Sequence, residues 1–267
     1  MKTKWVSRVL CGLLCAGLLC GFAAPPAEEN ENADLVPRQF QTAQQIDQIS
    51  VEDAISNVTI RTADTDHITV DYAETTEKPL YTISVEDGLL SVQTTTEEFE
   101  GKNISLFKIR MDGETVSGRP DHDLVITLPQ KQYQELSVAL AVGTLSVEGV
   151  KASQLTAESA VNTVELSGIQ ADQLNTASAV GQVTVRDSQI GNAEIDGAVG
   201  GVVVKNVTAS GQVTVSNAVG SVSLEDVTAH ELIVQSALGS TSYKNVKASY
   251  SSEAGIFNWS SGTVSRP

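Results

Sequence analysis

Apolar and polar residues alternate in a fixed pattern along the second half of the chain, and the pattern returns about every nineteen residues. LSVALAVGTLSVEGVKAS (136–153) is followed by LTAESAVNTVELSGIQAD (155–172) and LNTASAVGQVTVRDSQIG (174–191). Each copy holds a triplet of small or aliphatic residues. In steps of 19, 19, 19, 20 and 19, the triplets begin at Ala141, Ala160, Ala179, Ala198, Ala218 and Ala237.

Three apolar pairs recur in every copy, and the members of each pair are two residues apart. In the first copy they are Leu136 and Val138, Leu145 and Val147, and Val150 and Ala152. Residues two apart share one face of a strand, whereas a helix needs spacings of three and four. Periods near 20 residues are typical of solenoids. The fold class predicted is all-β, a parallel β-solenoid (β-helix) with ~19-residue coils stacked on aliphatic ladders. The alternative at this period, a leucine-rich repeat, needs a Leu-x-x-Leu-x-Leu frame that the copies lack.

The same frame occurs once nearer the N-terminus, in ISVEDAISNVTIRTADTDH, and predicts a first coil over residues 49–73. Glu77 interrupts it, so residues 74–130 are predicted to form a β excursion from the solenoid. Within it, YTISVEDGLLSVQ has a hairpin signal at Glu86-Asp87-Gly88. Two further strands are expected, at 103–111 and 123–129.

Regular coils are expected over residues 131–250, and the apolar columns end after Ala248. An open solenoid end exposes its ladders and its strand edge, so a distinct cap is expected there. Residues 251–267, together with the neighbouring Tyr250, are predicted to supply it, with Tyr250, Phe257 and Trp259 forming an aromatic lid. Residues 46–267 are therefore interpreted as a single β-solenoid domain.

The first 23 residues are predicted to be a secretory signal peptide that is cut after Ala23. Lys2, Lys4 and Arg8 precede 16 apolar residues that end at Ala24, which is short of the about 20 that a spanning helix needs. Lipidation and an uncleaved anchor are the less favoured alternatives, because Leu19 is a poor neighbour for a lipid-accepting Cys20. Residues 24–45 are polar and acidic and are expected to be a disordered linker.

Charge and cysteine content exclude several classes of function. All cysteines, Cys11, Cys15 and Cys20, lie in the signal segment, so the mature chain has no disulfide, thiolate nucleophile or cysteine-bound zinc. Removing the three N-terminal cations changes the formal charge from −16 to −19. Nucleic acid is a poor partner for such a chain because its binding depends on neutralising phosphates. The acidic surface favours solubility.

Candidate chemistry is sparse, and no catalytic, cofactor-binding or metal-binding residue is predicted. Each of two outward columns has one acid, Glu165 or Glu194, and a glycosidase needs two carboxylates at one bond. The histidines stand alone in the sequence and lack zinc-ligand spacing; they are His67, His122 and His230. The Asp64–Asp66 and Asp121–Asp123 segments offer oxygen ligands suited to calcium but are favoured as solvated turns. Nucleophile-elbow, Walker and dinucleotide motifs are missing. No cofactor is expected.

Three stretches together resemble a known bacterial family. They are VEDAISNVTIRTADTDHITVDY, YTISVEDGLLSVQ and DLVITLPQKQYQELSVALAVGTLSVEGV. The chain is similar over roughly residues 45–250 to the β-strand-repeat domain of unknown function labelled "putative adhesin". The resemblance implies an exported or envelope-associated protein without catalytic residues.

The sequence therefore predicts an exported, non-catalytic β-solenoid of the cell envelope that acts as a structural or binding module. Its expected partner is an envelope protein or a glycan, and its expected place is peripheral to the membrane after signal cleavage. Three alternatives remain. They are a protein that senses or regulates envelope stress, a filament that assembles end to end through exposed coils, against which the expected cap argues, and, less favoured, a small polysaccharide-active β-helix enzyme.

Overall fold

The computed structural model describes residues 35–75, 79–95, 123–255 and 257–266. These residues form strands that belong to one continuous sheet, and no helix occurs among them. In chain order the strands are β1 (Leu35–Thr42), β2 (Gln48–Ile55), β3 (Asn57–Ala63), β4 (Ile68–Thr75), β5 (Tyr81–Glu86), β6 (Leu89–Thr94), β7 (Asp123–Pro129), β8 (Gln132–Glu148), β9 (Lys151–Ser167), β10 (Gln170–Ala209), β11 (Gln212–Lys244), β12 (Val246–Ala254), β13 (Phe257–Ser261) and β14 (Val264–Ser265).

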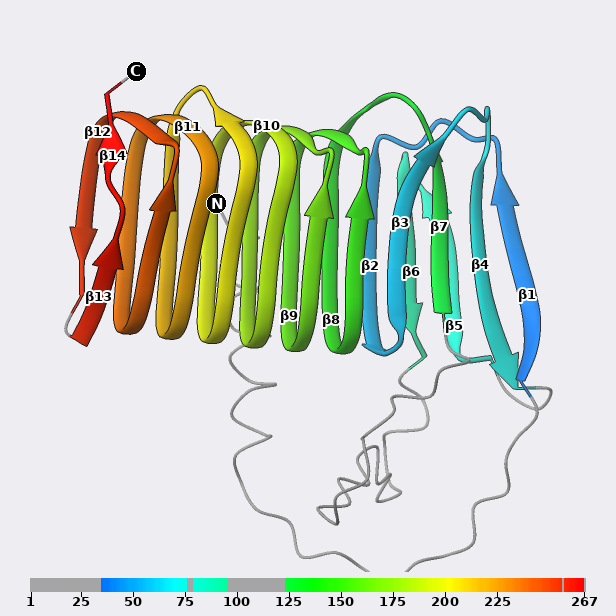
Figure 1. The fold of residues 1–267 in the computed structure, drawn as a ribbon. Coiled ribbons are helices and arrows are strands. Elements are labelled where there is room, and N and C mark those ends of the chain that lie inside the picture. The colour runs from blue at the N-terminus through cyan, green and yellow to red at the C-terminus, as the bar shows by residue number, and fades with distance from the viewer. Residues whose placement is uncertain (1–34, 76–78, 96–122, 256, 267) are drawn as a thin grey trace, which may run out of the picture.

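Successive copies of the repeat stack in parallel and in register. Leu136 of β8 lies beside Leu155 of β9, and Leu155 lies beside Leu174 of β10. The pairing of β10 with β11 takes up the one longer step, so that Val202 lies beside Val222. Because a coil has about nineteen residues, β10 and β11, with 40 and 33 residues, each wind through more than one turn (Figure 1). The predicted parallel β-solenoid is confirmed.

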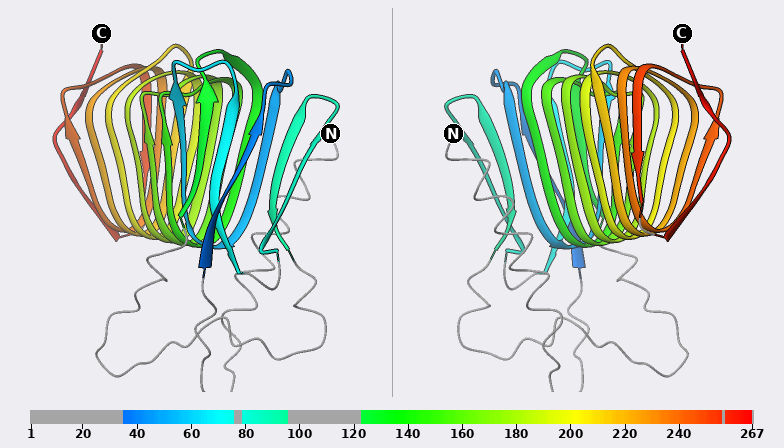
Figure 2. Two further views of the ribbon diagram at one scale, coloured as in Figure 1. Left: turned by 90° about the vertical axis from the view of Figure 1, so that its right-hand side faces the viewer. Right: turned by 90° about the vertical axis from the view of Figure 1, so that its left-hand side faces the viewer.

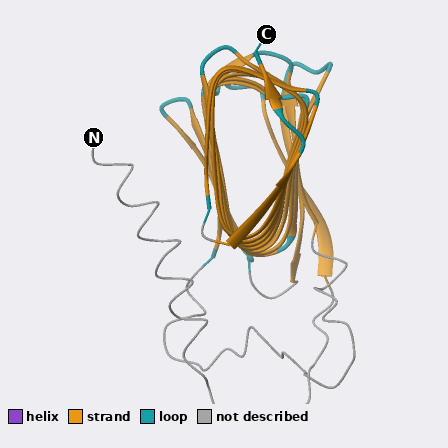
Figure 3. Cartoon of the chain, turned by 60° about the vertical axis from the view of Figure 1, so that its left-hand side comes forward, coloured by secondary structure: helices purple, strands orange, loops and turns teal. Residues whose placement is uncertain are grey.

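Seen nearly end-on, each coil is a flattened loop with two long sides and two edges (Figure 3). In the coil that starts at Leu136, one long side is 136–140 and the other is 144–148. The bend between them is Ala141-Val142-Gly143, and we call the edge formed by this bend and its equivalents the AVG edge. The chain returns to the first side through positions 149–154, and we call this the polar edge.

Inward side chains at equivalent positions form ladders that make up the core. One ladder is at most 5% exposed along its whole length and consists of Leu136, Leu155, Leu174, Ala193, Val213 and Leu232. Burying an aliphatic side chain contributes about 1.5–3 kcal/mol, and each coil adds several. A coil without neighbours cannot bury its ladder residues, so the stack stabilises its members mutually.

Glycine allows the coils to approach closely at the AVG edge. The third bend residue has φ of 135° to 150° in five coils, at Gly143, Gly181, Gly200, Gly220 and Gly239. A Cβ built on any of these glycines would lie 1.7–1.9 Å from a backbone oxygen of the preceding coil. That distance is far inside van der Waals contact. Asn162 takes the same position in one coil and is almost fully buried.

The polar edge bends with a different residue type. Gly149 and Gly168 are followed, coil by coil, by left-handed Asp187, Asn206, Asp226 and Asn245, with φ of 51° to 54°. Asn and Asp tolerate this conformation better than other side chains. Their side chains also link coils: Asn206 Nδ2 donates to Asp187 Oδ1 at 2.7 Å, and Asn245 Nδ2 donates to Asp226 Oδ1 at 2.6 Å.

The N-terminal part differs from the predicted first coil and excursion. β2 and β3 pair in parallel with β8, as a first coil should. β4, however, is antiparallel to β1 and β7, so the coil ends at β3 and does not continue to residue 73. The 81–94 hairpin forms as predicted, from β5 and β6. β6 and β7 also extend the coil sheets in parallel, on β2 and β3 respectively, and are therefore part of the stack (Figure 2).

Two other sequence expectations need correction. Residues 35–42 of the expected linker form β1, whose Phe40 packs against the core. The predicted aromatic lid is not confirmed. Tyr250 is 65% exposed and meets only the edge of His230, with ring centroids 5.6 Å apart. β13 continues the stack on β11, from Leu238 beside Phe257 onward. The signal segment and the 103–111 strand lie outside the described residues.

The C-terminal coil closes the stack with polar residues instead. Ser251 and Glu253 stand beside Leu232 and Val234 of the preceding coil. Burial, followed by the nearby Glu253 carboxylate and its hydrogen bond, raises the pKa of Tyr243. The half-buried phenol thus stays protonated and contacts the last coil. No helix in the described part of the chain is long and apolar enough to cross a membrane.

Tyr133 provides a test of core burial through pH dependence. It is fully buried and donates from its hydroxyl to the Pro129 carbonyl at 3.1 Å, and burial raises its pKa to about 12. The unfolded phenol titrates near 10. The stability held by the neutral phenol is therefore complete below pH of about 10 and is lost as pH rises towards 12.

We expect Tyr133→Phe to lose less stability than the wild type between pH 9 and pH 11, as measured by urea unfolding. Both proteins will still lose some stability, because burial also raises the pKa of Tyr81. Identical slopes for the two proteins would show that the Tyr133 phenol is not held neutral by the fold.

Candidate functional site

A shallow groove runs across several coils at the polar edge and is lined mainly by amide and hydroxyl groups. Its volume is about 620 Å³. Side chains from five successive coils meet there because outward residues recur at the same place in every coil. The lining residues are Gln132, Ala152, Gln170, Ala171, Asp172, Gln189, Ile190, Gly191, Thr208 and Ser210.

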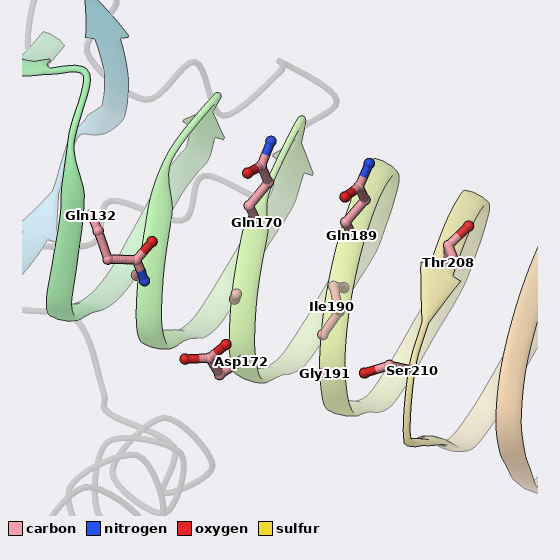
Figure 4. Close-up of a pocket in the computed structure, with 10 residues that line it drawn as sticks. Gln132, Gln170, Asp172, Gln189, Ile190, Gly191, Thr208 and Ser210 are labelled. Atoms are coloured by element: carbon pink, nitrogen blue, oxygen red, sulfur yellow. The ribbon is translucent and has the colours of Figure 1, made fainter.

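The order of the sequence explains the shape of this groove. One outward column contains Gln132, Gln170 and Gln189. Gln132 and Gln170 are two coils apart, with Lys151 between them, and Gln170 and Gln189 lie in adjacent coils. Figure 4 shows Gln170 and Gln189 side by side with their amides pointing the same way. Ala152 and Ala171 are buried below them, and these small side chains leave the surface hollow. The resulting surface can donate and accept hydrogen bonds along a line.

A second, smaller groove of about 290 Å³ lies on the first long side. Glu194 and Gln173 line it, together with Gln212. Gln212 is fixed by two hydrogen bonds. Its backbone N–H donates to Asn192 Oδ1 at 2.9 Å, and its side-chain Nε2 donates to Glu231 Oε2 at 2.8 Å. Both its backbone and its side-chain amide are therefore held by neighbouring residues.

The two outward acids considered from the sequence lie apart. Glu165 is on the second long side, where Arg186 Nη2 approaches its Oε1 at 2.8 Å. Glu194 is on the first long side with Asp196, two residues further along β10. The sequence analysis missed this shared face for Glu194 and Asp196, although the two-residue spacing on a strand predicts it.

The histidine and aspartate turns do not assemble a metal centre in the described residues, where no group of three or more His, Cys, Asp or Glu is placed to hold an ion. His67 Nδ1 lies 2.9 Å from Asp66 Oδ1, and this hydrogen bond lowers the pKa of Asp66. Asp123 accepts from Asn57 Nδ2 at 3.1 Å. Asp121 and His122 lie outside the described residues.

Cations on the second long side are paired with acids of neighbouring coils. Lys205 Nζ lies 3.2 Å from Glu225 Oε2, and Lys244 contacts the other oxygen. These hydrogen bonds, the one from Lys244 first, lower the pKa of Glu225. Exposed pairs of this kind contribute little stability. Their arrangement fixes where positive charge sits on the surface.

The tightest buried polar cluster joins the β5–β6 hairpin to the first coil. Tyr81 donates to Asp53 Oδ2 at 2.7 Å, and Ser56 donates to the same oxygen at 2.6 Å. The Tyr81 and Ser56 hydroxyls are 2.8 Å apart. Burial, and then the charge of Asp53, raises the pKa of Tyr81, so the phenol stays neutral and is no nucleophile. The cluster is a structural lock, which the sequence analysis did not identify.

The inward position of Asp53 at the AVG edge is polar in most later coils. Leu140 and Gly197 occupy it in two coils. Ser159, Ser178, Asn217 and Ser236 occupy it in the others. Each has a buried side-chain atom with no protein partner among the described residues, as do Asn162 and Thr176. Buried polar groups of this kind are commonly satisfied by ordered water.

The comparisons with known proteins concern the scaffold. The crystal structure of a putative adhesin from Bacteroides fragilis NCTC 9343 is 16% identical, with a TM-score of 0.53, and covers 88% of this chain and 97% of that one. A putative lipid binding protein from Parabacteroides distasonis ATCC 8503 is 15% identical, with a TM-score of 0.47, over 88% of this chain and 98% of that one. The first of these likenesses shows a shared fold only, because the identity is 16%.

A search of curated proteins finds no match to this sequence. The model of one family, described as Toastrack DUF4097, matches residues 46–217. This span includes the first coil, the hairpin and most of the regular coils, so it covers most of the ladders, most of the AVG edge and both grooves. The chain therefore belongs to the Toastrack DUF4097 family.

Proposed function

We propose that the chain is an exported, non-catalytic module of the cell envelope that acts by binding, in the manner of an adhesin, or as a structural element. One observation carries the proposal: the coils hold outward polar side chains in straight rows over open, shallow grooves. The row of Gln132, Gln170 and Gln189 is the best example. Such a surface suits an extended ligand better than a small reacting molecule, which is usually enclosed.

Glu165 and Glu194 do not form a catalytic pair. Glu165 is engaged by Arg186 on one long side, while Glu194 stands on the other, on the same face as Asp196. A glycosidase needs two carboxylates that face the same bond from either side. The Tyr81 phenol is buried and neutral, and its cluster with Asp53 serves the fold.

The amide row favours a neutral, hydroxyl-rich ligand such as an envelope glycan. Each glutamine offers one acceptor and two donors, which match sugar hydroxyls. Asp172 is the single acid that lines the groove, and Lys151 stands between Gln132 and Gln170 in the same column. These two opposite charges offset each other, so strongly charged polymers gain little from the surface. An envelope protein is the other partner we consider, and a sensory role for the same surface would use the same contacts.

The test is to incubate the full chain with a panel of neutral cell-wall glycans and to measure binding and chain cleavage in parallel. We expect binding without release of reducing ends. The Gln170→Ala/Gln189→Ala variant should weaken binding at least about fivefold, because each of the two lost hydrogen bonds contributes about 0.5–1.5 kcal/mol.

The matched control is Gln182→Ala, which removes an exposed glutamine from the second long side, where it donates to Thr184 at 3.3 Å. This variant should bind as the wild type does. Turnover of any glycan that disappears in Glu194→Gln would overturn the proposal and favour the β-helix enzyme.

A further inference from the structure

The AVG edge presents a continuous ridge of exposed aliphatic side chains. The second residue of every regular bend belongs to it, and from Val161 onward these side chains are 38–49% exposed. Tyr250 is the only other strongly exposed large apolar side chain in the described residues. The ridge consists of Val142, Val161, Val180, Val199, Val219 and Leu238.

The ridge spans six coils. Adjacent strands are about 4.8 Å apart, so Val142 and Leu238 are separated by about 24 Å. In backbone register, Ile55 lies beside Val142 at one end and Phe257 lies beside Leu238 at the other.

The neighbours of the ridge make it protrude. The residue before it is alanine in all six regular coils, and the residue after it is glycine in five of them and Asn162 in the other. None of these side chains is charged, and only Asn162 is large, with its amide buried. The edge is therefore a narrow, convex, uncharged band.

Charge is segregated between the two edges of the molecule. Between residues 132 and 250 the cations are Lys151, Arg186, Lys205, Lys244 and Lys247. All of them are at or next to the polar edge, in the register positions of 148–151. The exposed Asp187 and Asp226 bends are there as well. The solenoid is amphipathic across its height, with one apolar edge and one highly polar edge.

The described chain also begins at the AVG edge. Leu35 lies beside Thr75 at the end of β4, and β4 runs antiparallel to β7, whose start is beside that of β3. β3 begins immediately after the first AVG bend. Figure 1 shows β1 starting at the lower edge, where the long sides bend into one another. The first described strand therefore starts at this edge.

We propose that the AVG edge is a docking surface for a lipid bilayer, with the polar edge directed away from it. The proposal rests on the envelope location given under the proposed function. A fluid bilayer can close around a convex ridge one side chain wide. A rigid protein surface, including a second copy of this chain, meets such a ridge over far less than the about 800 Å² per partner of a stable interface.

The nearest charges predict which bilayer is preferred. Glu158 and Asp196 lie on the first long side, three residues before the ridge position of their coils, and no cation stands between positions equivalent to 139 and 146 in the regular coils. Anionic headgroups would be repelled by these acids. Phosphatidylcholine vesicles should bind the ridge better than vesicles rich in phosphatidylglycerol.

The test compares two tryptophan variants of the full chain on vesicles of brominated phosphatidylcholine. Val199→Trp places the probe on the ridge. Val203→Trp is the matched control, because Val203 faces outward on the second long side of the same coil, between the buried Val202 and Val204. The native Trp259, which remains after signal cleavage, gives both variants the same background. We expect at least about twofold stronger quenching of the added tryptophan at 199 than at 203, since four strand residues span about 13 Å.

A second arm uses flotation of the chain as it is recovered from cells. Val180→Ser/Val199→Ser/Val219→Ser should reduce binding to phosphatidylcholine vesicles about tenfold, through loss of buried apolar area, and Val203→Ser should not. Equal quenching at 199 and 203 would overturn the proposal. The proposal would also be overturned if the triple variant had a lower melting temperature but unchanged vesicle binding. It would be overturned, too, if the only effect of the triple variant were to dissociate a dimer of the chain, as seen by sedimentation. Glycan binding through the groove is independent of these readouts, so its failure would identify an error in the proposed function instead.

Discussion

Replacing Gly200 with alanine is expected to unfold the solenoid or to destabilise it by more than about 4 kcal/mol, a size reserved for severe backbone or core disruption. The added Cβ would lie 1.7 Å from the carbonyl oxygen of Gly181 and 2.7 Å from its carbon. Both atoms belong to backbone that is fixed by inter-coil pairing. The φ of 140° adds strain for any L side chain. Circular dichroism during thermal unfolding measures the effect.

The adjacent Gly201 provides the control. A Cβ there would find its nearest neighbour, the Ser221 hydroxyl, at an ordinary 3.5 Å. Gly201→Ala should therefore melt within a few degrees of the wild type. If Gly200→Ala were equally well tolerated, the coils would not be stacked as closely at the AVG edge as the structure has them.

The second large effect is expected for Tyr81→Phe, which should lower the free energy of unfolding by about 1.5–3 kcal/mol, the range for a hydrogen bond to a charged group. The phenylalanine ring keeps the edge-on contact with Tyr72, whose ring centroid is 5.6 Å away. Only the hydroxyl contacts to Asp53 and Ser56 are lost. Urea unfolding at neutral pH gives the value.

A double-mutant cycle with Asp53→Ala shows whether the loss comes from that contact. Coupling of more than about 1 kcal/mol between the two changes is expected, because they remove the same interaction. Additive effects would mean that Tyr81 stabilises the hairpin only through packing. The Tyr72→Phe variant is the control, because it keeps the ring contact with Tyr81 and leaves the hydrogen bond from Tyr81 to Asp53 intact.

The regular coils could be predicted from sequence because the same side chain type returns at the same place. Leu136, Leu155 and Leu174 are ladder neighbours nineteen residues apart, and that spacing alone determines which residues pair. Repetition supplies many copies of one weak signal. The left-handed bends at the polar edge have glycine in only two coils. Asp187 and Asn206 adopt the same left-handed conformation in later coils, so no single residue type marks these bends in the sequence.

The N-terminal strands could not be placed in this way. Ile68 and Val70 have the two-residue spacing of any half-buried strand, and that spacing is the same for parallel and antiparallel neighbours. The direction of β4 depends on β1, whose Pro37 and Arg38 make it resemble a linker. The choice between these pairings depends on contacts between distant segments, which a local pattern does not contain.

The candidate sites followed from the fold and were only partly visible in the sequence. Tyr81 and Asp53 are 28 residues apart and meet because β6 pairs with β2 and β5 with β6. The groove needs both the Gln170 row and the small Ala171 beneath it. The sequence shows the AVG triplet as a recurring group of small or aliphatic residues. It does not show that Val199 is exposed, because that exposure depends on the bend and on the small size of the neighbouring side chains.

We propose above all that the chain acts outside the cytoplasm as a non-catalytic scaffold that presents binding surfaces. The most direct test is cell fractionation followed by measurement of the intact mass of the recovered chain. We expect the chain in the envelope or the medium, with Ala24 as its first residue and without the signal segment. Recovery of a full-length chain that begins at Met1, and only from the cytoplasmic fraction, would show that the proposal is wrong.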